Sequence, residues 1–371
     1  MHSVIASPFL DEYLLLQPGS AKGAKIPRTL YEELLRQDGT SDVVPAWLVH
    51  AARRSWGLDL TDRAMAGTVL VRQPSSYGYC RASYELNLGC NYDCEHCYLG
   101  LKKFSGLKWQ KRKQLLRSMQ RAGVLWLQLT GGEPLIDRLF KETYDYAFRL
   151  GMMLSISSNG SRLHDPRILG LLQARRPYRL TLSVYGASAQ RYDAVTKRRG
   201  SFKLFEKGLN AAQEAGLPIS LNLIVTSTNA DETEDMKAFA RSRGLPHNVF
   251  SDMAPTIYGG VETVLTQSED HLVTREPFKG CHAGHTFFHA DPHGLVSICK
   301  VGRDHQFSLV KEGTAGLRKL GGIADSLQLR TGGCSGCLFG QNGTCGTCRP
   351  LAKLYQESGA PLKNYCRHGG F

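Results

Sequence analysis

The stretch Cys90-Asn91-Tyr92-Asp93-Cys94-Glu95-His96-Cys97-Tyr98 places three cysteines at CxxxCxxC spacing, directly after the apolar run 84–88. Three thiols this close in sequence can converge on one side of a compact loop. Four cysteines would complete a tetrahedral zinc site or a standard iron–sulfur site, whereas three leave one metal position open. A cluster needs such an open position if it must contact a substrate. The stretch alone also permits half of a zinc site, or three reduced cysteines on a loop.

A repeated alternation of strands and helices begins near residue 82. The expected strands are 82–88, 124–129, 152–157, 178–184, 219–225 and 249–252. The helices expected between them lie near 106–122, in a segment that ends at Leu150, and over 165–174, 202–215 and 232–243. Strands that alternate with helices of about 10–15 residues predict a parallel sheet with right-handed crossovers. Six such units predict an α/β fold, an open and partial (β/α)6 TIM-like barrel rather than a closed eight-stranded one.

Polar motifs follow several of these strands directly. The cysteine loop follows the first strand, Gly131-Gly132-Glu133-Pro134 the second and Ser158-Asn159-Gly160 the third, and Asp252 ends the sixth. In parallel α/β architectures, ligands meet the loops at the carboxyl ends of the strands. We therefore expect these segments to share one mouth.

Over about 82–255 this pattern resembles the radical S-adenosylmethionine (radical SAM) family. That family uses the CxxxCxxC spacing to hold a 4Fe-4S cluster, and it leaves the fourth iron for the amino and carboxylate groups of S-adenosylmethionine. The resemblance implies that Cys90, Cys94 and Cys97 hold this cluster. It also implies that the reduced cluster cleaves the sulfonium, and that the resulting 5′-deoxyadenosyl radical takes a hydrogen atom from the substrate.

The same resemblance implies which residues bind S-adenosylmethionine. Glycines let a ligand approach the backbone closely, and a carboxylate can pair with an ammonium group. In the family the Gly-Gly-Glu-Pro segment meets the amino group, which here means Gly131, Gly132 and Glu133. The other expected contacts, to the ribose or the methionine carboxylate, are Ser157, Asn159, Ser183 and one of Arg198 or Arg199. An exposed basic loop is the alternative for the two arginines.

Two positions depart from the commonest family pattern. His96 stands before the last cysteine, where an aromatic side chain usually stacks on adenine, although an imidazole can serve. Tyr185 replaces the aspartate often found in the Ser-x-Asp-Gly segment, so no role carries over for that aspartate. We expect His96 and Tyr98, which flank Cys97, to contribute to cofactor binding.

The C-terminal cysteines resemble the SPASM extension of peptide-modifying radical SAM enzymes. Their order is Cys281, Cys299, Cys334-x2-Cys337, Cys345-x2-Cys348 and Cys366. Carried over by order, one auxiliary cluster would use Cys334, Cys337, Cys345 and Cys366, and the other Cys281, Cys299 and Cys348. The spacings in the second half depart from the commoner ones, so the pairing stays open. The second set lacks a fourth cysteine. Its fourth iron would stay open or would bind His282, His285 or a substrate group.

The alternative for the paired CxxC motifs is a zinc knuckle on Cys334, Cys337, Cys345 and Cys348. Eleven cysteines in a cytosolic protein favour metal or redox chemistry over disulfides. Cys80 belongs to neither set and is expected to be a small buried hydrophobe.

Three domains are expected: 1–75, 76–260 and 261–371. The first reads as strand, two helices and strand, at 13–16, 30–36, 46–56 and 68–71. This order is compatible with a small α+β, winged-helix-like domain. In peptide-modifying radical SAM enzymes such a domain often captures a leader peptide. A structural cap on the barrel is the alternative.

Composition narrows the class of protein. Hydrophobic residues make up 42% and charged residues 21%, which is an ordinary globular composition. No run approaches the roughly 20 apolar residues of a membrane helix, and no signal sequence is visible, so a cytoplasmic protein is expected. The net charge of +13 favours an acidic partner. The basic residues are not interleaved with aromatics in one block, so we expect neither nucleic acid nor membrane as partner.

The leading functional hypothesis is a maturase that crosslinks a ribosomally made precursor peptide, with a reducing electron donor such as flavodoxin or ferredoxin. Asp252 is the candidate general base, and a solvated loop carboxylate is its alternative. The runner-up is a SPASM-type dehydrogenase that acts on a small molecule or a protein side chain. A zinc- or nucleic-acid-binding protein without catalysis is the third hypothesis.

Overall fold

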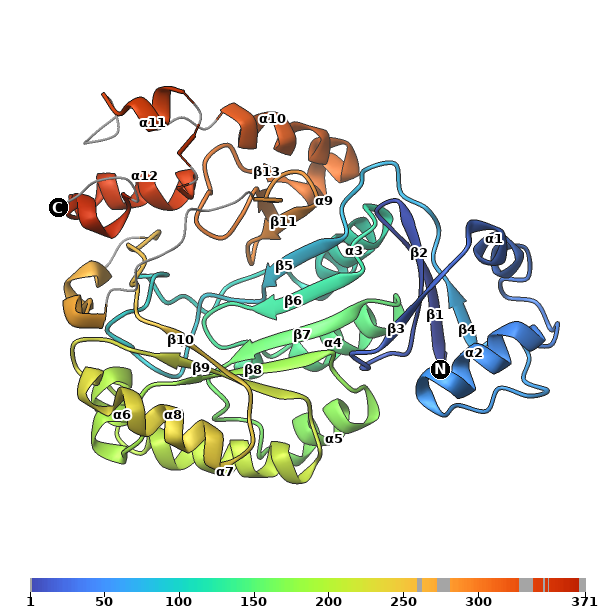
Figure 1. Cartoon of the computed structure of the whole chain (residues 1–371), viewed down its shortest axis with the longest axis horizontal. Helices are drawn as coiled ribbons and strands as arrows, with labels where there is room; N and C mark the ends of the chain where they lie inside the picture. The colour runs from blue at the N-terminus through green and yellow to red at the C-terminus, as the bar shows by residue number, and fades with distance from the viewer. Residues whose placement is uncertain are drawn as a thin grey trace.

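The computed structural model describes residues 2–258, 262–271, 281–326, 336–342, 344–345 and 347–366. Two sheets organise the chain, a four-stranded sheet near the N-terminus and a nine-stranded sheet that forms the body of the molecule (Figure 1). Among the described residues, no helix combines the length and the apolar character needed to cross a membrane.

The N-terminal unit contains β1 (Val4–Phe9), β2 (Glu12–Leu16), β3 (Gly23–Ile26), α1 (Arg28–Arg36), α2 (Ala46–Trp56) and β4 (Val69–Val71). Its strands lie in the order β3-β2-β1-β4, with β4 parallel to β1 and the other pairs antiparallel. The predicted helices and the strands at β2 and β4 are present. Strands β1 and β3 were not predicted, because β3 is short and contains a glycine and β1 is interrupted by Ser7-Pro8.

Both faces of this small sheet are covered. Successive side chains of a strand point to opposite faces. Val4 and Leu15 pack with α1 and α2, whereas Ile5 and Leu16 pack against Leu125 and Met153 of the large sheet. The buried guanidinium of Arg72 also donates to the carbonyls of Val124 and Gly151. These contacts lie just before β6 and β7, so the N-terminal unit covers the amino ends of the barrel strands.

The barrel elements are β5 (Arg81–Glu85), α3 (Trp109–Arg121), β6 (Trp126–Thr130), α4 (Phe140–Arg149), β7 (Met153–Ser158), α5 (Pro166–Ala174), β8 (Arg179–Val184), α6 (Ala189–Thr196), α7 (Ser201–Glu214), β9 (Ile219–Ile224), α8 (Thr233–Ser242) and β10 (His247–Phe250). Strands β5 to β10 are parallel and adjacent in chain order. The predicted six-stranded partial barrel is confirmed. Helix α6 was not predicted, and Asp252 lies two residues beyond β10 rather than at its end.

The C-terminal region extends the same sheet. It contains β11 (Phe287–Ala290), β12 (Leu295–Ser297), β13 (Phe307–Ser308), α9 (Leu309–Glu312), α10 (Lys319–Ser326), α11 (Leu338–Gln341) and α12 (Arg349–Glu357). Strand β11 pairs in parallel with β5, and β12 and β13 follow as antiparallel neighbours. This extension was not predicted. It attaches the segment between Cys281 and Cys299 to the first barrel strand.

Two glycines after β6 let its loop pack directly on the loop after β5. A Cβ on Gly131 would lie 2.2 Å from the Asn87 carbonyl oxygen, and one on Gly132 would lie 2.1 Å from the Gly89 carbonyl oxygen. The backbone amides of Gly132 and Glu133 donate to these two carbonyls, each at 2.9 Å. Gly131 also has φ +134°, which favours glycine. The two loops therefore meet backbone against backbone.

We predict that Gly132→Ala destabilises the fold, because the added methyl group overlaps backbone that cannot rotate away. The expected loss is about 1–3 kcal/mol, as for other overpacked sites. Gly170→Ala is the matched control, since Gly170 is exposed in α5 with open space around its Cβ position. That control should gain about 0.5–1 kcal/mol from the helical preference of alanine. Denaturant unfolding of both variants tests this, and equal midpoints would contradict it.

Candidate active site

The cysteine loop, residues 89–98, is held on one side by the carboxyl end of α6. The backbone amide of Asp93 donates to the Thr196 carbonyl at 2.9 Å, and that of Glu95 donates to the Val195 carbonyl at 3.2 Å. The hydroxyl of Thr226, just after β9, donates to the Glu95 carboxylate at 2.9 Å. The loop after β5 is thus tied to segments that follow β8 and β9, as the shared mouth predicts.

The other side of the cysteine loop is held by the segment after β7. The Asn159 amide donates to the Asn91 side-chain oxygen at 2.9 Å, and the Asn91 amide donates to the Ser161 hydroxyl at 2.9 Å. The Asn159 nitrogen also lies 3.9 Å from the Cys90 sulfur. Asn159, predicted near the ribose, therefore contacts the cysteine loop itself.

Glu133 joins the ends of β6 and β7. Its buried carboxylate accepts hydrogen bonds from the Leu135 amide, the Ser158 hydroxyl and the Asn159 amide, at 2.7–2.9 Å. Burial raises the pKa of Glu133 to about 7, although these three donors oppose the shift. Within the described part of the chain no lysine or arginine pairs with this carboxylate. A cation brought to it would therefore stabilise its ionised form.

The three thiols of the loop lie within electrostatic reach of one another. Burial, with smaller contributions from Glu133 and Cys97, raises the pKa of Cys90 to about 12. Burial also raises the pKa of Cys94, with contributions from Cys90 and Cys97. In the described residues no three His, Cys, Asp or Glu side chains are arranged to hold a single metal ion. A four-iron cluster bonds each cysteine to a different iron, so its thiols need not meet at one ion, and three partly buried thiols on one loop are the kind of donor set that such a cluster uses.

His96 turns toward the barrel segment after β8. Its ring centroid lies 5.3 Å from that of Tyr185, at a tilt of 39°. Burial, with a smaller effect of Lys102, lowers the pKa of His96 to about 4, so the imidazole is neutral at neutral pH. Its Nδ1 is buried without a hydrogen-bond partner in the described residues. A buried free ring nitrogen beside the cysteines fits the edge of an adenine base.

The remaining predicted cofactor residues lie in two different places. Ser157 accepts a hydrogen bond from the Gln128 amide at 2.7 Å, and the Ser183 carbonyl accepts one from the Tyr192 hydroxyl at 3.4 Å. Both serines are partly buried on strands. Arg198 and Arg199 are exposed, and Arg198 donates to the Asn91 carbonyl at 2.5 Å. Both arginines are therefore exposed beside the cysteine loop, and their contact with the cofactor stays a prediction.

The strands carry a polar face that the sequence analysis did not identify. On β6 to β9, partly buried polar residues alternate with fully buried leucine and isoleucine. The polar set is Gln128, Ser155, Ser157, Thr181, Ser183, Ser220 and Asn222. Parallel strands covered on both faces by apolar layers read as continuous hydrophobic runs, so this alternation is the signal that marks one polar face.

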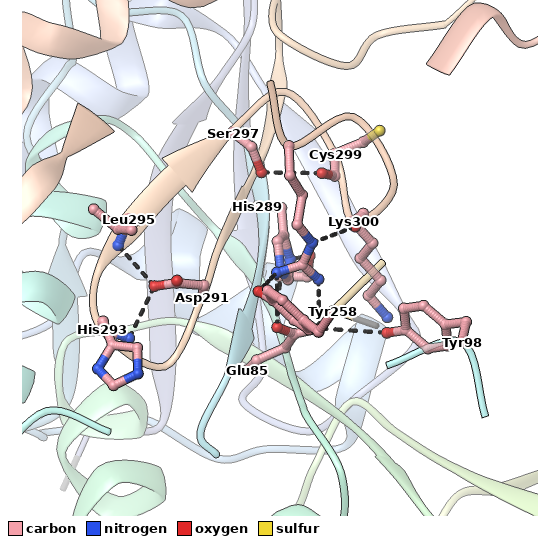
Figure 2. A network of polar contacts seen from close by, with 12 residues as sticks. Glu85, Tyr98, Tyr258, His289, Asp291, His293, Leu295, Ser297, Cys299 and Lys300 are labelled. Carbon is pink, nitrogen blue, oxygen red and sulfur yellow. Dashed lines mark hydrogen bonds and ion pairs between the residues drawn. The ribbon is translucent and has the colours of Figure 1, made fainter. Parts of the chain in front are cut away.

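A second cluster missed from the sequence surrounds Glu85 at the end of β5. The Arg303 guanidinium donates to this carboxylate, and Figure 2 shows His289 and Tyr98 close to Glu85. The two guanidinium nitrogens lie 2.8 and 3.1 Å from the Glu85 oxygens, and the Tyr98 hydroxyl donates to Glu85 at 3.3 Å. Arg303 also donates to the Tyr258 hydroxyl and, at 2.6 Å, to the Lys300 carbonyl.

Arg303 supplies the positive charge that compensates the buried Glu85 carboxylate. Burial would raise the pKa of Glu85, but the polar contacts with His289 and Arg303, together with the positive charge of Arg303, lower it to about 2. Burial lowers the pKa of His289 to about 4, so His289 is neutral near pH 7 and Arg303 supplies the positive charge. His289 is held by Ser83, 2.8 Å from its Nδ1, while its Nε2 lies 3.4 Å from Glu85.

This cluster connects the two cysteine-bearing regions. Tyr98 follows Cys97 in the cysteine loop, and Lys300 follows Cys299 in the C-terminal region. The Tyr98 hydroxyl donates to Glu85, and the charges of Glu85 and Arg303 both act on the Lys300 ammonium; Figure 2 shows Tyr98, Glu85 and Lys300 in one cluster. The Lys300 ammonium forms no hydrogen bond or ion pair with the described residues. The polar core thus fixes the C-terminal region against the first barrel strand.

The C-terminal cysteines are only partly brought together by the described residues. Burial raises the pKa of Cys299 to about 11, and the thiols of Cys348 and Cys281 add to this increase. These three are the set predicted for one auxiliary cluster. Cys337, Cys345 and Cys366 are partly buried, and Cys334 lies outside the described residues. The second predicted set and the zinc-knuckle alternative both need Cys334, so their geometry stays a prediction.

Asp252 lies in the segment that follows β10. It is partly buried beyond β10, between Ser251 and Met253, whose backbone atoms bond to Gln267. Its role as a general base remains a prediction.

Comparison with known proteins agrees with this geometry. The fold and the loop define a partial-barrel protein with a three-cysteine site at the carboxyl ends of its strands. Residues 84–240 match the sequence model of the Radical SAM superfamily, and this segment includes the cysteine loop, Gly131 to Pro134 and Asn159. Residues 84–240 are therefore a radical SAM domain, as the motifs predicted.

Individual relatives differ in function. Mycofactocin maturase MftC of Mycolicibacterium smegmatis is 27% identical over 244 residues, which are 60% of this chain and 59% of the relative. An AdoMet-dependent heme synthase of Methanosarcina barkeri is 24% identical over 235 residues, 62% of this chain and 64% of the relative. The chain covers less than two thirds of the length of these relatives.

A solved structure shares the fold over almost the whole chain. The crystal structure of Streptococcus suis SuiB bound to precursor peptide SuiA has a TM-score of 0.61 and 13% sequence identity, and covers 90% of this chain and 92% of that chain. At this identity the likeness shows a common fold.

We predict that Arg303→Met strongly destabilises the protein above neutral pH, because it leaves the Glu85 carboxylate buried without its cation. The expected loss is about 3–5 kcal/mol. The wild-type pKa of Glu85 is lowered, so its stabilising contribution is present above 4.5 and is lost as the pH falls toward 2. The variant carboxyl can protonate, so its deficit should be smaller at about pH 5 than at about pH 8 in urea unfolding.

The matched control is Arg53→Met, which breaks the exposed pair of Arg53 and Asp59. An exposed pair is worth about 1 kcal/mol or less. The double variant Glu85→Gln/Arg303→Met should recover part of the loss. Equal losses in Arg303→Met and Arg53→Met would show that the buried pair does not hold the C-terminal region in place.

Proposed function

We propose that this chain is a radical SAM enzyme that modifies a ribosomally made precursor peptide by forming a crosslink. The observation that carries the proposal is the convergence of the Cys90, Cys94 and Cys97 thiols on one loop at the carboxyl ends of the barrel strands. The match of 84–240 to the Radical SAM superfamily supports the reaction class. The relation to a mycofactocin maturase and the SuiB fold support a peptide substrate.

Each cofactor has a proposed set of residues. Cys90, Cys94 and Cys97 would hold a 4Fe-4S cluster. When bound, this cluster would supply the electron that cleaves S-adenosylmethionine to a 5′-deoxyadenosyl radical. The proposed S-adenosylmethionine contacts are His96, Tyr98, Gly131, Gly132, Glu133, Ser157, Asn159, Ser183 and one of Arg198 or Arg199.

The chain's own residues contribute positioning and electrostatics. Glu133 offers a buried carboxylate without a cationic partner in the described residues, which suits the amino group of S-adenosylmethionine. Neutral His96 offers an unpaired ring nitrogen to the adenine. The partly buried polar face, with Gln128 and Ser157, would orient polar groups of the cofactor or substrate. Asp252 is our candidate to accept the proton that crosslinking releases.

Two auxiliary clusters are proposed for the C-terminal region. Cys281, Cys299 and Cys348 would hold one, supported by the mutual effect of their thiols. The other would use Cys334, Cys337, Cys345 and Cys366. Such clusters can accept the electron left on a substrate radical, which suits crosslinking better than group transfer. A reducing partner such as flavodoxin or ferredoxin completes the proposal, and so many reduced thiols suit the cytoplasm.

The position of the N-terminal unit bears on how a peptide would bind. It covers the amino ends of β6 and β7, while the cysteine loop lies at the carboxyl ends. A leader bound to this unit must pass along the barrel to present its modified residues. An extended chain covers about 3.3 Å per residue, as a strand does. A leader therefore needs about six residues to run the length of a barrel strand of about six residues. The structural-cap alternative needs no such spacing.

A second candidate function keeps the same chemistry with another substrate. The AdoMet-dependent heme synthase among the relatives acts, by its name, in the synthesis of a small molecule. A SPASM-type dehydrogenase acting on a small molecule or a protein side chain would use the same cysteine loop. The test is a search for modified peptides in a strain that carries the gene for this chain and the genes next to it. If no modified peptide is found, this alternative is favoured.

We predict that Cys94→Ala abolishes cleavage of S-adenosylmethionine, because two thiols cannot hold the cluster with one open iron. The measurement is 5′-deoxyadenosine formation with dithionite after anaerobic reconstitution. Cys80→Ala is the matched control, since Cys80 is buried at the Thr286 carbonyl and belongs to none of the three proposed ligand sets. It should keep its iron and its activity. Cleavage by Cys94→Ala equal to wild type would refute the proposed function.

We also predict about twelve irons per chain, the sum of three four-iron clusters, with no zinc. Cys348→Ala should lose about four of these irons and keep uncoupled 5′-deoxyadenosine formation, because Cys348 belongs only to the C-terminal set. Iron, sulfide and zinc analysis of one sample tests this. About four irons together with one zinc would instead make the C-terminal region structural.

A further inference from the structure

A cationic rim surrounds the outer side of the cysteine loop. We use this name for Lys102, Lys103, Lys197, Arg198 and Arg199. All but Lys102 are exposed, and Lys102 keeps 18% of its side chain accessible. The rim comes from two segments that are about 95 residues apart in sequence and that the fold brings together.

Backbone hydrogen bonds set this rim directly on the loop. Asp93 and Glu95 donate to the carbonyls of Thr196 and Val195, so residues 195–199 run beside the loop. The Arg198 guanidinium donates to the Asn91 carbonyl at 2.5 Å, and the Lys102 ammonium donates to the Tyr92 carbonyl at 3.1 Å. The charge of Lys102 also affects Cys90 and Cys94. The rim therefore lies immediately outside the proposed cluster ligands.

The acidic residues of these segments neutralise the rim only in part. Asp93 pairs with Lys102 at 2.5 Å. Glu95 accepts from Thr226, and Asp193 accepts from Ser201 and from backbone amides at the start of α7. Among the described residues, Lys103, Lys197 and Arg199 form no ion pair. A net positive surface of this kind attracts an acidic partner.

Apolar side chains stand in the same loop as the two lysines. Leu101 is 47% exposed and Phe104 is 70% exposed, and the Phe104 ring lies over Gly89. Protein–protein interfaces combine an apolar centre with a polar or charged rim. The surface is thus suited to a protein rather than to a small anion.

We infer that the cationic rim docks an acidic one-electron carrier protein, of the flavodoxin or ferredoxin class, that reduces the cluster held by the cysteine loop. This inference rests on the proposed function. Electron transfer slows steeply with distance, and no other described surface shares backbone hydrogen bonds with the cysteine loop while carrying so many unpaired cations. The opposite end of the barrel is covered by the N-terminal unit.

The test uses the reconstituted full chain and 5′-deoxyadenosine formation without added substrate. A purified acidic flavodoxin with its reductase is one reductant, and dithionite, which needs no docking, is the other. We expect Lys103→Glu/Lys197→Glu to lower the flavodoxin-driven rate about tenfold at low salt, because opposite charges steer association. The dithionite-driven rate of this variant should equal that of wild type.

The matched control is Lys22→Glu/Lys311→Glu, which changes the net charge equally. Both lysines are exposed, one in the loop before β3 and one in α9, away from the cysteine loop (Figure 1). This control should keep both rates. Raising the ionic strength from about 0.01 M to about 0.1 M shortens the screening length from about 30 Å to about 10 Å, so it should slow the wild type more than the rim variant.

Equal flavodoxin-driven rates in the rim variant and the control would overturn the docking inference while leaving the proposed function intact. That result would also be expected if the rim bound an acidic peptide instead. Absence of dithionite-driven cleavage in the wild type would overturn the proposed function and, with it, the docking inference.

Discussion

The candidate site depends on the backbone contact between the loops that follow β5 and β6. Gly131 and Gly132 approach the carbonyls of Asn87 and Gly89 so closely that no side chain fits between them. The start of the cysteine loop is therefore positioned by main-chain hydrogen bonds rather than by a ligand. Contacts from the segments after β7, β8 and β9 complete the support, so the cysteine loop is fixed from several sides.

Two buried carboxylates at this end of the sheet have opposite electrostatic environments. Glu85 is paired with the Arg303 guanidinium, which holds its pKa at about 2. Glu133 has only neutral hydrogen-bond donors, and burial raises its pKa to about 7. A low-dielectric surrounding magnifies both effects. Glu85 thus joins two parts of the protein, whereas Glu133 keeps the capacity to stabilise a positively charged group.

The surfaces proposed for the peptide, the cofactor and the reductant lie on different sides of the protein. The N-terminal unit lies at the amino ends of the strands, and the C-terminal region extends the sheet from β5 (Figure 1). The Glu85 cluster lies between the two cysteine-bearing regions, and the polar strand face lies on β6 to β9, on the other side of β5 from the C-terminal region. The cationic rim faces outward from the cysteine loop. Peptide, cofactor and reductant can therefore reach the centre without competing for one surface.

Much of this organisation is legible in the sequence. The six barrel strands appear within a few residues of their predicted positions, because apolar runs followed by glycine and polar turns mark both the strands and their carboxyl ends. The CxxxCxxC and Gly-Gly-Glu-Pro segments identify the mouth, and the polar alternation on β6 to β9 was present although unrecognised. All of these signals lie within about ten residues of chain and follow from the periodicity of strands and helices.

Only the tertiary structure decided which distant residues meet. Strand β11 is a run of four residues, and nothing in it specifies β5 as its neighbour. Glu85 and Arg303 are 218 residues apart, and each alone reads as an ordinary charged residue. The exposed position of Arg198 and Arg199 likewise depends on how α6 packs beside the cysteine loop. Such pairings follow from packing and the matching of buried charges across the whole chain, which local periodicity does not encode.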